Sequence, residues 1–165
     1  MFRVSIMGAI LALSACGTFP EPDKNSVITA QQYIGLTERH NRKELKEFVG
    51  VDPVRTEWCA AFVNAVLEID GIPNLNNQTK YPPLMARSFI YWGELVEHAD
   101  IKRGDVVVFP RGNEGWQGHV GFYVETQMLD GKNYYVILGG NQDNQVRYDL
   151  FDPKKAIAIR RWNKG

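Results

Sequence analysis

A cysteine, a histidine and an asparagine stand where they could act together on a carbonyl carbon. Cys59 opens a stretch with apolar residues at helical spacing, and the free N–H groups and dipole at a helix start favour a thiolate. His119 lies near the start of a strand-like apolar run, and Asn141 follows a second such run. A thiol, an imidazole that takes its proton and an amide that orients the imidazole are the parts needed for nucleophilic acyl transfer.

The residues around Cys59 predict a buried helix over residues 57–69. Thr56 suits the N-cap position, and Glu57 suits the positive end of the helix dipole. One apolar stripe follows at helical spacing, made of Phe62, Val63, Val66 and Leu67. The backbone N–H of Cys59 would then lie free at the helix start, where it can donate to an oxyanion.

The remaining elements predict an α+β fold. Further helices are expected over residues 29–36, 41–49 and 84–95. Strands are expected over residues 106–109, 118–124, 133–138, 145–150 and 156–162. Turn signals at Asp130-Gly131 and Asp152-Pro153 favour an antiparallel meander, packed on the helix that Cys59 begins.

Alternation along the strands brings the polar candidates together. His119 would share one strand face with Gly121 and Tyr123. Asn141 has the parity to project from the same face at the end of the next strand, whereas Gln142 has the opposite parity.

The amino terminus predicts export. Residues 1–15 contain one cation, an apolar run and then small residues, the layout of a secretory signal. Leu13-Ser14-Ala15-Cys16 resembles the lipobox of bacterial lipoproteins, in which the cysteine is lipidated; the alternative is a plain signal peptide. Residues 16–27 then form a lipidated cysteine with a flexible tether, and residues 28–165 form one domain.

Composition excludes several classes of protein. The 165 residues are 44% hydrophobic and 23% charged, which is typical of a single globular domain. Nineteen basic side chains balance 19 acidic ones, so no basic surface points to nucleic acid. With Cys16 lipidated, Cys59 has no intramolecular partner and is either an inert core residue or a reactive one.

Four motifs follow one another along the chain: TEWCAAFV at 56–63, RGDVVVF at 103–109, GHVGFY at 118–123 and GGNQ at 139–142. With these motifs the sequence resembles the NlpC-type and CHAP peptidoglycan hydrolases, which are papain-like cysteine peptidases or amidases. The resemblance covers most of residues 28–162. Glu57 stands where a proline is common in such sequences.

The resemblance implies that Cys59 is the nucleophile, His119 the general base and Asn141 the residue that orients the imidazole. Relatives use His, Glu, Asn or Gln at the third position, so Gln142 is the alternative there, or a residue that donates to the oxyanion. Trp58 and Trp116 are candidates for a substrate groove, although packing is the alternative for Trp58.

Other chemistry is less well supported by the pattern. Asp105 is expected to fix the turn before its strand, and His40 and His98 are expected at the surface. A zinc site is not expected, because no two ligand candidates stand at metal-binding spacing, and the sequence calls for no cofactor.

The sequence therefore predicts a monomeric, lipid-anchored cysteine hydrolase that cuts an amide bond in peptidoglycan, in the stem peptide or between sugar and peptide. We expect it at the outer membrane, facing the periplasm, because Gly17 is not the aspartate that tends to retain lipoproteins in the inner membrane. The alternatives are a catalytically idle module of the same fold that binds cell wall or an envelope protein, and a transferase that uses the same thiol.

Overall fold

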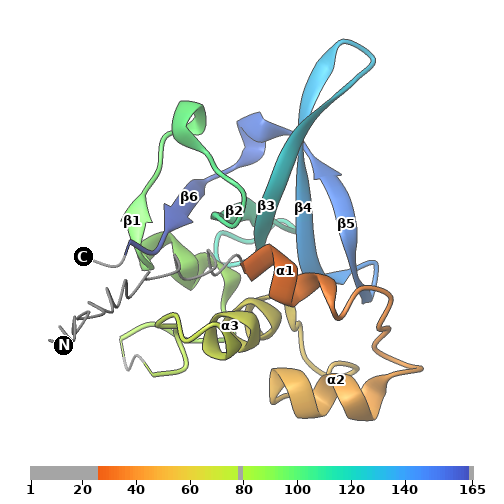
Figure 1. The fold of residues 1–165 in the computed structure, drawn as a ribbon. Helices are drawn as coiled ribbons and strands as arrows, with labels where there is room; N and C mark the ends of the chain where they lie inside the picture. Colours follow the sequence, from red (N-terminus) through yellow and green to blue (C-terminus); the bar gives the residue numbers. More distant parts are fainter. Residues whose placement is uncertain (1–25, 78–79, 164–165) are drawn as a thin grey trace, which may run out of the picture.

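A computed structural model describes residues 26–77 and 80–163 (Figure 1). The predicted signal peptide, the lipidation site at Cys16 and residues 16–25 of the tether lie outside the described residues. Ser26 and Val27, which the sequence analysis placed in the tether, are buried in the first helix.

The helices precede most of the sheet, as expected for an α+β chain. The α-helices are α1 (Ser26–Gln31), α2 (Arg42–Val49) and α3 (Cys59–Ile69). Short 3₁₀ helices are η1 (Ala86–Tyr91), η2 (His98–Asp100) and η3 (Pro153–Lys155). Among the described residues, no helix is long and apolar enough to cross a membrane.

The predicted helix over residues 84–95 is wrong in its second half. The chain leaves the 3₁₀ helix at Trp92 and enters a two-residue strand, β1 (Glu94–Leu95). Gly93 lies between the two elements and has a φ of 59°. Its backbone is so close to Arg161 that a Cβ would lie 2.5 Å from the Arg161 carbonyl oxygen. Pairing of β1 with the last strand therefore replaces helix here.

Six antiparallel strands form one sheet in the order β1-β6-β2-β3-β4-β5. The remaining strands are β2 (Val106–Pro110), β3 (Gly118–Leu129), β4 (Lys132–Gln142), β5 (Gln145–Phe151) and β6 (Ala158–Arg161). The run from β2 to β5 is the predicted meander. The last strand departs from it, because β6 returns to pair with β2 instead of extending the sheet beyond β5.

The helices and the sheet bury a common core. Val106, Val108 and Phe122 lie on the sheet face that packs with α3, together with the buried apolar residues of that helix. The opposite sheet face carries a second cluster around Val107, Phe109 and Ile137. The alternation along β2 and β3 therefore separates two apolar layers, as the period of a strand requires.

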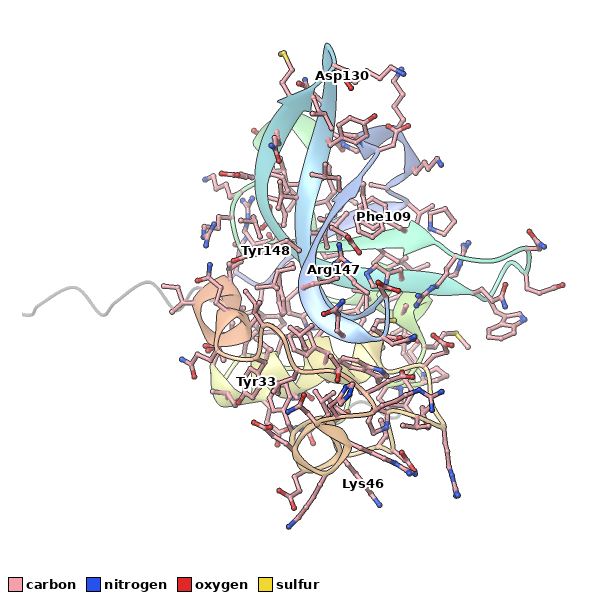
Figure 2. The ribbon with its side chains drawn as sticks, turned by 90° about the vertical axis from the view of Figure 1, so that its right-hand side faces the viewer. Tyr33, Lys46, Phe109, Asp130, Arg147 and Tyr148 are labelled. Carbon is pink, nitrogen blue, oxygen red and sulfur yellow. The ribbon has the colours of Figure 1, made fainter. Side chains whose placement is uncertain are left out.

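The β3–β4 hairpin extends well past the helical layer. Asp130 at its turn and Lys46 on α2 lie at opposite ends of the molecule (Figure 2). The site-forming ends of β3 and β4, Gly118 and Gln142, are the ends far from this turn.

Asp105 has the structural role that the sequence predicts for it. Its buried carboxylate accepts a hydrogen bond from the backbone N–H of Lys102 and forms a two-pronged ion pair with Arg161, at 2.7 Å for each oxygen. These contacts fix the turn into β2 and connect it to β6.

Gly140 is the point where the sheet meets the start of α3. A Cβ at this residue would lie 2.5 Å from the Trp58 ring and 2.7 Å from Cβ of Phe62, so only glycine permits the approach. Trp58 is fully buried and packs edge-on against Phe62. This contact sets Cys59, the next residue, beside the ends of β3 and β4.

Candidate catalytic site

Cys59 is the first residue of α3, close to the predicted place. The N-cap is Trp58, so the prediction of Thr56 as the N-cap is wrong. The first helical hydrogen bond runs from the N–H of Phe62 to the carbonyl of Trp58, which leaves the N–H of Cys59 outside the helical ladder. The side chain is only 3% exposed.

His119 and Gln142 form a buried pair whose hydrogen-bond roles are fixed. The amide nitrogen of Gln142 donates to two backbone carbonyls, those of Ile137 at 3.2 Å and Arg147 at 2.6 Å. Its oxygen must therefore face Nε2 of His119, which lies 2.9 Å away and donates to it. The neutral imidazole then carries its proton on Nε2 and a lone pair on Nδ1.

Nδ1 of His119 is buried and has no hydrogen-bond partner among the described residues. The ring is held flat against Phe151, with centroids 5.3 Å apart and planes 4° apart. Gly139 leaves the room for this arrangement, because a Cβ there would lie 2.9 Å from Oε1 of Gln142 and 3.4 Å from Nε2 of His119. The nitrogen that could accept a proton is thus preorganised and unoccupied.

The structure does not bring Asn141 to the imidazole. Its side-chain nitrogen donates to the carboxylate of Glu57 at 2.6 Å instead. Asn141 has a φ of 56°, and the β4–β5 register shifts between Gly139 and Gln142. The bulge breaks the alternation from which the sequence predicted Asn141, so it is Gln142 that faces His119.

Arg111 is a charged residue at this site that the sequence analysis missed. Its guanidinium donates to the backbone carbonyl of Asn141 at 3.1 Å and forms an ion pair with Glu57 at 3.3 Å. Arg111 follows β2 in an irregular connection, so no periodicity marked it. The signal that could have found it was a cation directly after a strand that pairs with the His119 strand.

Burial decides the protonation of the thiol. Loss of solvent raises the pKa of Cys59 above its ordinary value, while Arg111 and the backbone N–H groups of Val120 and Ala60 pull it down. The contact with Val120 also places the sulfur beside the residue that follows His119. The expectation that the helix start favours a thiolate is therefore outweighed by desolvation in this structure.

Burial also keeps the imidazole neutral. Desolvation lowers the pKa of His119 from 6.5 to about 4, with a further decrease from Arg111 and an opposing increase from the Gln142 hydrogen bond. Thiol and imidazole are thus both uncharged at neutral pH in the described conformation.

A pocket with a volume of about 480 Å³ opens at Cys59. Its walls are formed by Glu57, Pro82, Leu84, Met85, Ala86, Arg111, Gly112, Trp116, Gln117 and Gly118. Trp116 is 62% exposed at this wall, and its role as a groove residue stays a prediction. Trp58 is not a groove residue, because its ring is fully buried in the core under Gly140.

A larger cavity, of about 830 Å³, lies at the β3–β4 hairpin and η3, and Cys59 and His119 are not among its lining residues. His98 lines it and is exposed as predicted, with Nδ1 2.8 Å from the Tyr135 hydroxyl. His40 is exposed too. Across residues 26–77 and 80–163, no group of three or more His, Cys, Asp or Glu side chains could hold a metal ion.

The neutral, buried His119 predicts a pH dependence of stability. The unfolded chain binds a proton at this residue near pH 6.5, whereas the folded chain binds it only near pH 4. Between pH 6.5 and pH 4 the unfolded state thus binds more protons than the folded state. The free energy of unfolding is therefore highest above pH 6.5 and falls as the pH drops toward 4. Urea unfolding across this range should show the wild type losing roughly 3 kcal/mol more than His119→Gln. Parallel stability curves for the two chains would contradict the assignment.

Comparison with known proteins supports the fold. No family model matches the chain, and no curated protein matches it. Among solved structures, an NlpC/P60 family protein from Bacillus cereus ATCC 10987 matches with a TM-score of 0.52 at 16% sequence identity. The match covers 87% of this chain and 41% of the other, so the chain spans less than half the length of that protein. The chain therefore has a mixed helical and antiparallel fold that is similar to that of an NlpC/P60 family protein.

Proposed function

We propose that the protein is a cysteine hydrolase that cleaves an amide bond of peptidoglycan, in the stem peptide or between sugar and peptide. The observation that carries the proposal is the fixed tautomer of His119. Gln142 holds the proton on Nε2 and leaves a lone pair on buried Nδ1. Cys59, at the start of α3, contacts the backbone of Val120, the residue after His119, and lines a pocket.

The proposed reaction is a two-step acyl transfer. Sγ of Cys59 attacks the carbonyl carbon while Nδ1 of His119 takes the thiol proton, and the free N–H of Cys59 donates to the developing oxyanion. The imidazolium returns the proton to the leaving amine, which departs and leaves a thioester. Water then attacks the thioester, with the imidazole again as base, and releases the acid and the thiol. Both groups start uncharged, so proton transfer accompanies the attack.

Two lines of support point to peptidoglycan. The fold is similar to that of an NlpC/P60 family protein, and the four sequence motifs resemble those of NlpC-type and CHAP hydrolases. The pocket adds an apolar wall of Leu84, Met85 and Trp116 beside the charged pair Arg111–Glu57, which suits a substrate with both aliphatic and ionic groups.

The burial of the thiol favours a second candidate, a non-catalytic cell-wall binding module of the same fold. Such a module would need no accessible nucleophile, and Cys59 is 3% exposed. A transferase that passes the acyl group to an amine is the third candidate and uses the same first step.

Digestion of purified sacculi separates these candidates. The wild type is expected to release soluble fragments, and Cys59→Ala should lose at least 10³-fold in rate while keeping its unfolding curve, because the thiol forms the covalent intermediate. Mass spectrometry of the fragments identifies the bond and shows whether water or an amine receives the acyl group. Digestion by Cys59→Ala at the wild-type rate would refute the nucleophile, and binding without digestion by the wild type would favour the binding module.

The orienting residue is tested by neighbouring substitutions. Gln142→Ala should reduce kcat by about 10²- to 10⁴-fold, because the imidazole loses the partner that sets its tautomer. Asn141→Gly is the matched control, since glycine accepts the positive φ at this position, and it should keep kcat within a few-fold of the wild type. Steady-state rates on soluble peptidoglycan fragments decide the point. The opposite ranking of the two variants would restore Asn141 as the orienting residue.

We further propose that the protein is a lipoprotein anchored through Cys16 at the outer membrane, facing the periplasm. The lipobox-like residues before Cys16 and the polar, proline-containing residues after it support this proposal. Cells fed radioactive palmitate are expected to label the wild-type chain and not Cys16→Ser. Label on the serine variant, or on neither chain, would remove the anchor from the proposal.

A further inference from the structure

Among the described residues, Arg111 is the only cation that lines the pocket at Cys59. Glu57 is the only acidic residue in the described part of that lining, and the two residues form an ion pair. The other lining residues, Cys59 included, carry no charge at neutral pH. A substrate that enters this pocket with a negative charge therefore has one counter-charge to meet.

The guanidinium is held in place by its contact with the end of β4. One terminal nitrogen donates to the backbone carbonyl of Asn141, and the other faces Glu57. Arg111 and Cys59 line the same pocket, and the contact of Arg111 with Asn141 holds the guanidinium beside the residue that precedes Gln142. A group bound to Arg111 would thus lie near the scissile bond.

The contact with Glu57 is exchangeable. The Glu57 side chain is 77% exposed and that of Arg111 42% exposed, at a separation of 3.3 Å. Exposed pairs of this kind contribute little to stability, because water competes for both charges. Glu57 also keeps a second partner, the side-chain amide of Asn141, when Arg111 leaves it.

We propose that Arg111 is a specificity residue that binds a substrate carboxylate next to the scissile amide, and that this carboxylate replaces Glu57. The proposal rests on the hydrolase function proposed above and defines its substrate class. The enzyme acts on peptide fragments with a free carboxyl near the cleaved bond and disfavours the same fragments with a carboxamide there. A carboxylate gains a charge-assisted, two-pronged contact with the guanidinium that a carboxamide cannot match.

A competition experiment tests the selectivity. Disaccharide peptides released from sacculi by a muramidase are used untreated and after conversion of their carboxyl groups to carboxamides with carbodiimide and ammonia. Both forms are mixed with the full chain, and mass spectrometry of the products gives the ratio of the two kcat/KM values. The wild type should prefer the free-carboxyl form by about 10- to 100-fold.

The variants distinguish substrate binding from an effect on the thiol. Arg111→Gln should bring the ratio close to one, because any change in thiol ionisation affects both substrates equally. Arg111→Lys keeps the charge without the fork and should give an intermediate ratio. Glu57→Gln removes the competing carboxylate and should raise kcat/KM for the free-carboxyl form several-fold. Arg55→Gln, which changes an exposed arginine outside the pocket, is the matched control and should leave the ratio unchanged.

The outcomes separate this proposal from the function on which it rests. If the wild type cuts both forms equally, or if Arg111→Gln keeps the wild-type ratio, Arg111 does not select a carboxylate and the hydrolase function stands. If the wild type cuts neither form, the proposed function fails first. Titration calorimetry measures how tightly the untreated fragment binds when no cleavage occurs. It compares Cys59→Ala with the Cys59→Ala, Arg111→Gln double variant. Arg111→Gln should weaken binding of the untreated fragment about tenfold or more, and equal binding would overturn the proposal.

Discussion

The hydrogen bond between Nε2 of His119 and Oε1 of Gln142 is the interaction on which the arrangement of the candidate site depends. In this bond Nε2 must be the donor and Oε1 the acceptor, because the Gln142 amide nitrogen already donates to two backbone carbonyls, one in β4 and one in β5. The sheet itself therefore selects the tautomer of the imidazole. The two glycines before Asn141 serve the same end, since Gly139 leaves room for the pair and Gly140 lets the start of α3 approach the sheet.

The electrostatics of the site are set by a competition between burial and charge. The helix start, Arg111 and two backbone N–H groups all favour a thiolate at Cys59, but desolvation opposes them and is the larger effect. Desolvation lowers the pKa of His119 and so keeps the imidazole neutral, without the positive charge that would stabilise a thiolate. A neutral thiol and a neutral imidazole are the consistent outcome in the described conformation.

The sequence predicts best where a strong period meets a buried surface. The apolar stripe after Cys59 predicts α3, and the alternation from Gly118 predicts the start of β3, because burial of one face enforces both periods. Asn141 shows where this reasoning fails, since one residue with a positive φ shifts the parity of everything after it. Arg111 lies in an irregular connection, where only the folded chain determines which groups meet. The helix predicted through residue 95 failed because pairing of β1 with β6 is a long-range contact with no local signal.

The burial of Cys59 has a consequence for the lifetime of the protein as well as for its reaction. Peroxide and disulfide exchange both require an accessible sulfur in its anionic form, and this side chain is 3% exposed with a raised pKa. The resting conformation therefore shields its only described thiol from sulfenic acid formation and from mixed disulfides. In the described conformation the sulfur is therefore protected in surroundings that would oxidise an exposed thiol.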